Sequence, residues 1–120
     1  MARITVLRNS DQAADYQAGE VVFSQGDQAD HMYVLVDGAV DIVVNDVLVG
    51  TAGPGEAFGE MALIDQTLRS ATAVAKTDSR IVPIDRKRFL FMVTETPNFA
   101  LQLMAMMAER LRAKEDGLVG

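Results

Sequence analysis

The chain has no cysteine and a single histidine among its 120 residues. Without cysteine it cannot form a disulfide framework, a thiolate metal site, an iron–sulfur cluster or a cysteine nucleophile. One histidine cannot supply a metal site of several histidines and a carboxylate, and no Gly-x-Ser-x-Gly motif indicates a serine hydrolase. We therefore expect no catalytic residues, no metal and no enzyme activity. We interpret the histidine, His31, as a surface residue in a turn beside Asp30.

Long hydrophobic runs and an excess of basic charge are also missing. No stretch approaches the roughly 18 consecutive apolar residues of a membrane-spanning helix, and the first ten residues lack the apolar core of a secretory signal. Eleven basic residues against 17 acidic ones give a net charge of −6, which disfavours direct DNA binding. We expect a cytoplasmic protein that contacts neither membrane nor DNA. Any anion ligand would need a local positive site.

Short apolar segments separated by turn residues fill the first two thirds of the chain. Asp37-Gly38 separates residues 32–36 from 39–44, and Asn45-Asp46 separates the latter from 47–49; both pairs are hairpin signals. Further strands are expected at residues 20–24, 70–75 and 80–85, and a loop at Gly50, Gly53, Pro54 and Gly55. This regular spacing is typical of a closed β-barrel or jelly roll.

The hydrophobic period becomes helical after Asp85. A short helix is expected over residues 86–93, with Phe89, Leu90 and Val93 facing inward. A long helix is expected to begin near Pro97, which suits a first helical turn, and to carry an apolar stripe. The stripe comprises Phe99, Leu103, Met106, Met107 and Leu111, with a second edge of Ala100, Leu101 and Met104. Two interpretations stay open: the whole stripe is core, or one edge is a seam for a partner helix.

The residues with distinctive chemistry concentrate at positions 58–72. Gly59 would let a ligand approach the start of a short helix, whose first backbone N–H groups attract anions. Arg69 is the only cation of the segment, and its guanidinium can bind a phosphate or carboxylate with two hydrogen bonds. Ser70 adds a hydroxyl donor, and Glu60 can accept hydrogen bonds from sugar hydroxyls. The segment therefore predicts the local anion site that an acidic chain requires.

Phe-Gly-Glu-Met-Ala-Leu from Phe58, followed by Arg-Ser-Ala-Thr from Arg69, resembles the phosphate-binding cassette of cyclic nucleotide-binding domains. This family includes bacterial catabolite activators, protein kinase A regulatory subunits and cyclic-nucleotide-gated channels. Glycine-marked turns and Gly53-Pro54-Gly55 extend the resemblance over most of the chain. It implies a mainly β fold with C-terminal helices: a β-roll, or double-stranded β-helix jelly roll, with a short phosphate-binding helix and a C-terminal lid helix. One domain would span residues 1–120, with a core of about 16–114.

The resemblance also implies a role for each matching residue. Arg69 would clamp the cyclic phosphate together with Ser70 and backbone N–H groups near Met61 and Ala62. Glu60 would hold the ribose 2′-hydroxyl. The remaining implied site residues are Gly59, which would make room for the sugar; Val47, Val49, Phe58, Leu63 and Ala71, which would line the pocket; and Arg110 and Lys114, which would lie near the base. The ligand would be cyclic AMP (cAMP), with cyclic GMP (cGMP) as the alternative, and no cofactor is implied.

These inferences predict a stand-alone cyclic nucleotide sensor with no DNA-binding, kinase or channel domain. It would signal in trans by repositioning its C-terminal helix, toward an unidentified protein partner or in a homodimer through that helix. The alternative is a β-roll that binds no nucleotide and serves as a protein-interaction or dimerisation module. On the sensor hypothesis, Arg69→Ala leaves the fold intact, and truncation after Phe91 removes a lid and weakens binding.

Overall fold

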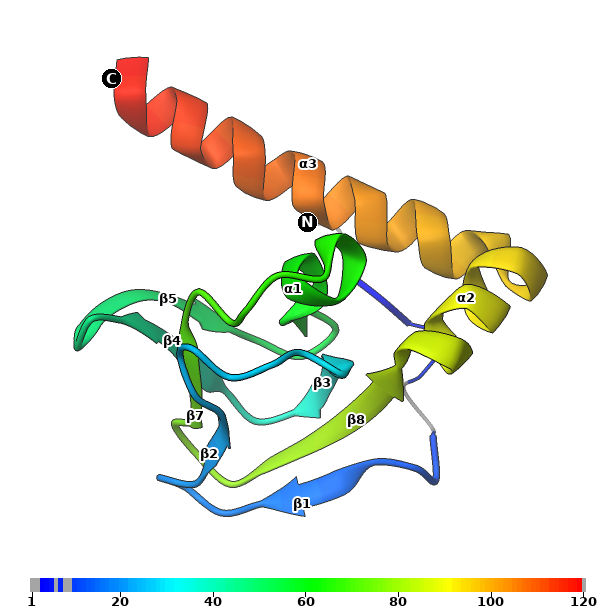
Figure 1. The fold of residues 1–120 in the computed structure, drawn as a ribbon, viewed down its shortest axis with the longest axis horizontal. Coiled ribbons are helices and arrows are strands. Elements are labelled where there is room, and N and C mark those ends of the chain that lie inside the picture. Colours follow the sequence, from blue (N-terminus) through cyan, green and yellow to red (C-terminus); the bar gives the residue numbers. More distant parts are fainter. Residues whose placement is uncertain (1–2, 6, 8–9, 120) are drawn as a thin grey trace.

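The computed structural model describes residues 3–5, 7 and 10–119, with side chains described up to residue 113. These residues form eight strands and three helices (Figure 1). The strands are β1 (Ala14–Tyr16), β2 (Val21–Phe23), β3 (His31–Asp37), β4 (Val40–Val44), β5 (Val47–Ala52), β6 (Ala57–Phe58), β7 (Thr72–Ala75) and β8 (Ser79–Asp85). The helices are α1 (Glu60–Asp65), α2 (Arg86–Glu95) and α3 (Pro97–Val119).

The strands pair in two antiparallel sheets, ordered β1-β8-β3-β6 and β2-β7-β4-β5. Alternate residues of both sheets point into a shared hydrophobic cluster, because successive side chains of a strand face opposite sides. The buried members of this cluster are Phe23, Leu35, Val40, Ala52, Phe58, Ala73 and Ile81. The expected β-roll with C-terminal helices is confirmed.

The two expected hairpin turns have different outcomes. Asn45 and Asp46 adopt positive φ angles of 49° and 66° and join the paired strands β4 and β5, as expected. The hairpin expected at Asp37-Gly38 is wrong, since β3 and β4 belong to different sheets. Gly38 has φ of 102°, and a Cβ there would overlap with Ser79 Oγ. The glycine therefore permits a close crossing between sheets.

Two strand boundaries also differ from expectation. Gly50 lies within β5, opposite Ile42 of β4, so its assignment to a loop is wrong. Pairing with β4 supplies the backbone hydrogen bonds of this segment, and tertiary pairing of this kind overrides local propensity. The strand expected from residue 70 begins at Thr72, because the backbone bends at Ser70 and Ala71.

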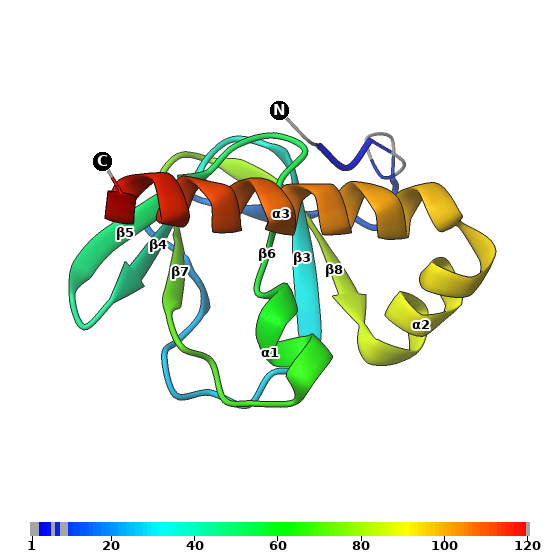
Figure 2. The same cartoon turned by 90° about the horizontal axis from the view of Figure 1, so that it is seen from above.

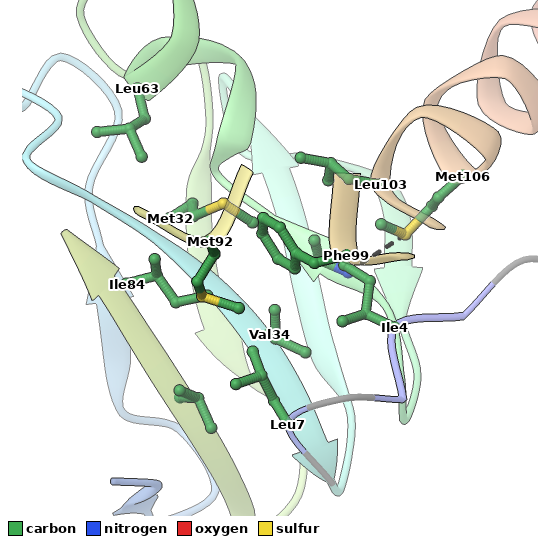
Figure 3. Packing of buried hydrophobic residues seen from close by; sticks show 12 residues of the cluster. Ile4, Leu7, Met32, Val34, Leu63, Ile84, Met92, Phe99, Leu103 and Met106 are labelled. Carbon is green, nitrogen blue, oxygen red and sulfur yellow. Dashed lines mark hydrogen bonds between the residues drawn. The ribbon is translucent and has the colours of Figure 1, made fainter. Parts of the chain in front are cut away.

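The helix α3 crosses the molecule above α1 and the sheets (Figures 1 and 2). Its buried residues Phe99, Leu103 and Met106 pack against Met32 and Val34 of β3 in a second hydrophobic cluster (Figure 3). The other buried members are Ile4, Leu7, Ala57, Leu63, Val82, Ile84 and Met92. Ile4 and Leu7 thus belong to the core, which was expected to begin at about residue 16. Truncation after Phe91 would remove core side chains, so a point substitution is the better test of α3.

The inward face predicted for α2 is confirmed at Phe89 and wrong at Leu90 and Val93. Leu90 and Val93 are exposed, whereas Met92 is buried and Phe89 is half-buried against Phe99. Helical periodicity places Phe89 and Met92 on one face, three residues apart, and this face packs on the core. On α3, Leu101 and Met104 of the second edge are exposed, and so is Leu111 of the main stripe, so the interpretation that the whole stripe is core is wrong for this chain. No helix of the described residues is long and apolar enough to cross a membrane.

Candidate ligand-binding site

The segment that carries Arg69 is fixed by the turn between β2 and β3. The backbone N–H of Arg69 donates to the carbonyl of Asp27 (2.8 Å), and the Arg69 carbonyl accepts from Gly26 (2.8 Å). Gln28 and Leu68 form an isolated antiparallel bridge beside them. Two loops far apart in sequence are therefore joined by backbone hydrogen bonds, and they set the point from which the Arg69 side chain extends.

The guanidinium of Arg69 lies inside the protein, with only 4% of the residue exposed. Its Nη1 donates to the Gly59 carbonyl at 2.6 Å, and its Nη2 donates to the His31 carbonyl. The guanidinium carbon lies 4.0 Å above the centroid of the Phe23 ring and 5.8 Å from that of Tyr33. Arg69→Ala, which is expected to leave the fold intact, would therefore remove buried contacts as well as the proposed ligand contact.

Arg69 is a buried cation that no described carboxylate neutralises through an ion pair. Burial lowers the pKa of Arg69 from its ordinary value, although Tyr33 and nearby acidic groups oppose that shift. A charge in a low-dielectric site is costly unless it is paired, so an anionic ligand would relieve this cost. The arrangement can therefore bind an anion without first breaking an ion pair of Arg69.

The first turn of α1 adds backbone donors beside this guanidinium. Gly59 precedes the helix in the left-handed conformation (φ 74°), and none of the described side chains caps the helix there. The first four N–H groups of a helix have no intrahelical acceptor, which includes those of Met61 and Ala62. The space beside Gly59, expected for a sugar, is occupied: a Cβ there would lie 2.6 Å from Arg69 Nη1 and 2.9 Å from Phe23 Cε2.

Glu60 is also buried, with 4% of the residue exposed. Its carboxylate accepts a hydrogen bond from Nη1 of Arg110 on α3 at 2.8 Å. The Nη2 group of Arg110 donates to the Ala57 carbonyl at 2.5 Å and lies 3.7 Å from the Glu56 carboxylate. The structure thus joins α3 to the first turn of α1 through an ion pair that the sequence analysis did not anticipate.

The other predicted site residues are distributed over several environments. Ser70 and Met61 are exposed, Ala62 is buried, and Ala71 is half-buried. Phe58 and Leu63 lie in the two hydrophobic clusters, whereas Val47 and Val49 are exposed on β5. The side chain of Lys114 lies outside the described residues. The structure therefore brings together Gly59, Glu60, Arg69 and Arg110.

Three contributors to the site were missed: the Phe23 ring, the Tyr33 ring and the His31 carbonyl. His31 is the first residue of β3 and half-buried, so its assignment to a surface turn is wrong. Its Nδ1 lies 2.7 Å from Oδ1 of Asp30, and this hydrogen bond lowers the pKa of Asp30. No spacing along the chain identifies these contacts. The usable signal is the presence of aromatic residues in the strands that surround the cassette, because their rings can pack on the arginine.

Comparison with known proteins identifies the family of this chain. The model of the family described as "Cyclic nucleotide-binding domain" matches residues 14–96. The chain is 35% identical over 102 residues to the Cyclic AMP receptor protein of Thermus thermophilus, covering 81% of this chain and 47% of that protein. It is 39% identical over 85 residues to the cAMP-dependent protein kinase regulatory subunit of Eremothecium gossypii, covering 71% of this chain and 19% of that protein. The chain spans about half the length of the first of these relatives, and less of the second.

Solved structures agree with this placement. The Catabolite Activator Protein of Thermus thermophilus has a TM-score of 0.78 at 34% identity, covering 89% of this chain and 53% of that one. An EAL enzyme solved with cGMP bound has a TM-score of 0.66 at 31% identity, covering 90% of this chain and 30% of the enzyme. The same enzyme with cAMP bound has a TM-score of 0.64 at 34% identity, again covering 90% of this chain and 30% of the enzyme. The chain belongs to the cyclic nucleotide-binding domain family.

Proposed function

We propose that this chain senses a cyclic nucleotide, with cAMP as the ligand and cGMP as the alternative. The observation that carries the proposal is the buried guanidinium of Arg69 at the start of α1. It donates to the carbonyl of Gly59, the residue that directly precedes the buried Glu60. A cyclic nucleotide offers a phosphate and a ribose hydroxyl close together. These two groups complement a cation with unused N–H donors and a hydrogen-bond-accepting carboxylate.

In this proposal the cyclic phosphate binds Arg69, the Ser70 hydroxyl and the backbone N–H groups of Met61 and Ala62. The ribose 2′-hydroxyl binds Glu60. The phosphate would displace the Gly59 and His31 carbonyls from the guanidinium or take its remaining N–H groups. The sugar is proposed to lie beside Gly59 on the side that Arg69 and Phe23 do not fill. The proposed apolar lining consists of Val47, Val49, Phe58, Leu63 and Ala71.

The signalling step is proposed to pass through Arg110. The Glu60 carboxylate is buried and one of its oxygens is already bound to Arg110, so we propose that ribose displaces Arg110, and with it α3, when it binds Glu60. A ligand shifts such an equilibrium only by the difference in its affinities for the two arrangements. The Glu60–Arg110 ion pair supplies that difference, since it exists in one arrangement and is lost in the other.

Three features support the remaining parts of the proposal. Ser70 stands directly after the cassette arginine, where cGMP-preferring members of the family often have threonine, which favours cAMP. Two of the relatives named above are a receptor protein and a regulatory subunit, and this chain matches only 30% of the EAL enzyme, which supports a sensor rather than an enzyme. The exposed edge of α3, formed by Leu101, Met104 and Leu111, is the proposed surface for output in trans to a protein partner or a second copy. A cytoplasmic location remains part of the proposal.

Thermal unfolding with and without each nucleotide tests the function directly. At a ligand concentration of a hundred times Kd, binding adds about 2.7 kcal/mol of stability. For a domain of this size this raises Tm by on the order of ten degrees. We expect this rise in the parent protein, and its loss in Arg69→Lys, which keeps the charge and loses the fork of donors.

The matched control is Arg80→Lys. Arg80 is an exposed arginine on β8, 3.6 Å from Asp15 and outside the site, so its variant should respond to nucleotide like the parent. A folded parent protein whose Tm rises with neither nucleotide would contradict the sensor function and favour the protein-interaction module. An equal rise of Tm in Arg69→Lys would show that nucleotide binding does not depend on the guanidinium fork of Arg69.

A further inference from the structure

Three aromatic rings form a continuous layer beneath the proposed phosphate site. The ring of Phe23 (β2) stacks on Tyr33 (β3) with centroids 5.7 Å apart, and Tyr33 stacks on Phe58 (β6) at 5.5 Å. Phe23 and Phe58 are 6.1 Å apart and tilted. We call these three residues the aromatic layer. Its members come from both sheets, so the layer joins the two halves of the β-roll at the point where Arg69 enters.

The guanidinium carbon of Arg69 lies over the Phe23 ring of this layer, 4.0 Å from the ring centroid. A cation this close to an aromatic face is attracted by the negative charge of the ring face. The edge of the guanidinium is held at the same time by the carbonyls of Gly59 and His31. A guanidinium has five N–H groups, so these two hydrogen bonds leave others available to a ligand at the edge.

We propose that Phe23 is a positioning residue for phosphate binding, acting through Arg69. This inference rests on the proposed function. Arginine has a large rotamer freedom, and a side chain that must be ordered on binding weakens affinity. Phe23 covers one face of the guanidinium, which restricts it to a single plane and excludes water from that face. The phosphate then meets a fork of donors whose orientation is already fixed.

The same arrangement explains why position 59 carries no side chain. A Cβ at position 59 would approach both Arg69 Nη1 and Phe23 Cε2 more closely than 3.0 Å. The glycine is therefore needed where the guanidinium and the ring meet, in addition to its positive φ. Phe23, Arg69 and Gly59 thus form one packed unit, in which the ring determines where the guanidinium can lie.

The test combines the ligand-free protein with binding measurements. The Nε–Hε NMR resonance of Arg69 in the ligand-free parent should be shifted upfield by the ring current of Phe23. We expect Phe23→Leu to return this resonance to the ordinary arginine position and to weaken cAMP binding about tenfold, which corresponds to about 1.4 kcal/mol. Phe23→Tyr keeps the ring and should restore both the shift and the affinity.

The matched control is Phe89→Leu, which removes a half-buried ring that packs on Phe99, away from the site. It should change neither the Arg69 resonance nor the affinity. If Phe23→Leu does not fold, an unshifted Arg69 resonance in the parent overturns the proposal. An upfield shift in the parent, together with parental cAMP affinity of Phe23→Tyr, supports it. Equal cAMP affinity of the parent and a folded Phe23→Leu overturns the positioning role alone. A folded parent that binds neither nucleotide overturns the proposed function as well.

Discussion

Arg69 and Glu60 lie at the same end of α1 and are equally buried, yet their charges are compensated in different ways. The cation of Arg69 rests on two backbone carbonyls and an aromatic ring. The anion of Glu60 is paired with Arg110, a cation that comes from α3 fifty residues later. On the proposed function, Arg69 exchanges only neutral partners for a phosphate, whereas Glu60 exchanges a charged partner for ribose. One charge of the proposed site would then bind the ligand, and the other would report binding.

The comparison predicts the largest effect at Arg110. In Arg110→Gln the Glu60 carboxylate stays buried without its cation, and breaking a buried ion pair from one side costs several kcal/mol. Because 38% of the Arg110 side chain is exposed, solvent screens the pair, and we expect a loss of about 3 kcal/mol in the free energy of unfolding. Chemical denaturation measures it. The same variant should gain more stability from cAMP than the parent, since ribose no longer competes with Arg110.

Arg112→Gln is the matched control for this prediction, because Arg112 is an exposed arginine of α3 two residues further along. We expect its stability to stay within about 0.5 kcal/mol of the parent, with the same response to cAMP. If Arg110→Gln were as stable as Arg112→Gln, the ion pair would not hold α3 to the site. A smaller stability gain from cAMP in Arg110→Gln than in the parent would show that Arg110 stabilises the nucleotide-bound state instead of competing with ribose.

A somewhat smaller effect is expected on the Arg69 side of the comparison. Gly59→Ala places a methyl group against Arg69 Nη1 and Phe23 Cε2 and keeps a residue with Cβ at positive φ. The positive φ costs about 1 kcal/mol, and the close contacts add roughly another 1 kcal/mol. Gly26→Ala isolates the first contribution, because Gly26 has φ of 91° and a methyl group there would meet no atom within 4 Å. Equal destabilisation of the two variants, measured by denaturation, would show that the contact with Arg69 is easily relieved.

What the sequence could predict depends on how local each feature is. The turn at Asn45-Asp46 was predicted because residues that tolerate positive φ stand between two apolar runs. The turn at Asp37-Gly38 has the same local pattern, but its flanking strands pair with distant partners, and no local rule contains that information. The grouping of Gly59, Glu60 and Arg69 followed from one short segment that carries this chemistry and resembles the family's phosphate-binding cassette.

The ion pair of Glu60 with Arg110 and the ring of Phe23 were not predicted, for the same physical reason. Both depend on how elements far apart in sequence pack in space: α3 against α1, and β2 against the segment before β7. Hydrophobic periodicity indicates that α3 has a buried face, but it cannot specify which carboxylate a flanking arginine meets. Charged and aromatic contacts of this kind have to be read from the folded chain.

The smallest effect concerns the charge of Arg69 as sensed by Tyr33. Burial raises the pKa of Tyr33 above its ordinary value of 10.0, and the positive charge of Arg69 opposes that rise. The folded chain therefore holds this phenol proton more tightly than the unfolded chain. The resulting stability is present below pH 10 and is lost as the pH rises through the folded-state pKa.

In a Tyr16→Phe background, which leaves Tyr33 as the remaining tyrosine, Arg69→Gln should raise the pKa of Tyr33 further, and Arg80→Gln should leave it unchanged. Tyrosinate absorbance during an alkaline titration measures both. A pKa that stays the same in Arg69→Gln would mean that solvent already screens the Arg69 charge. The contrast between a cation with neutral partners and an anion in an ion pair would then lose its electrostatic basis.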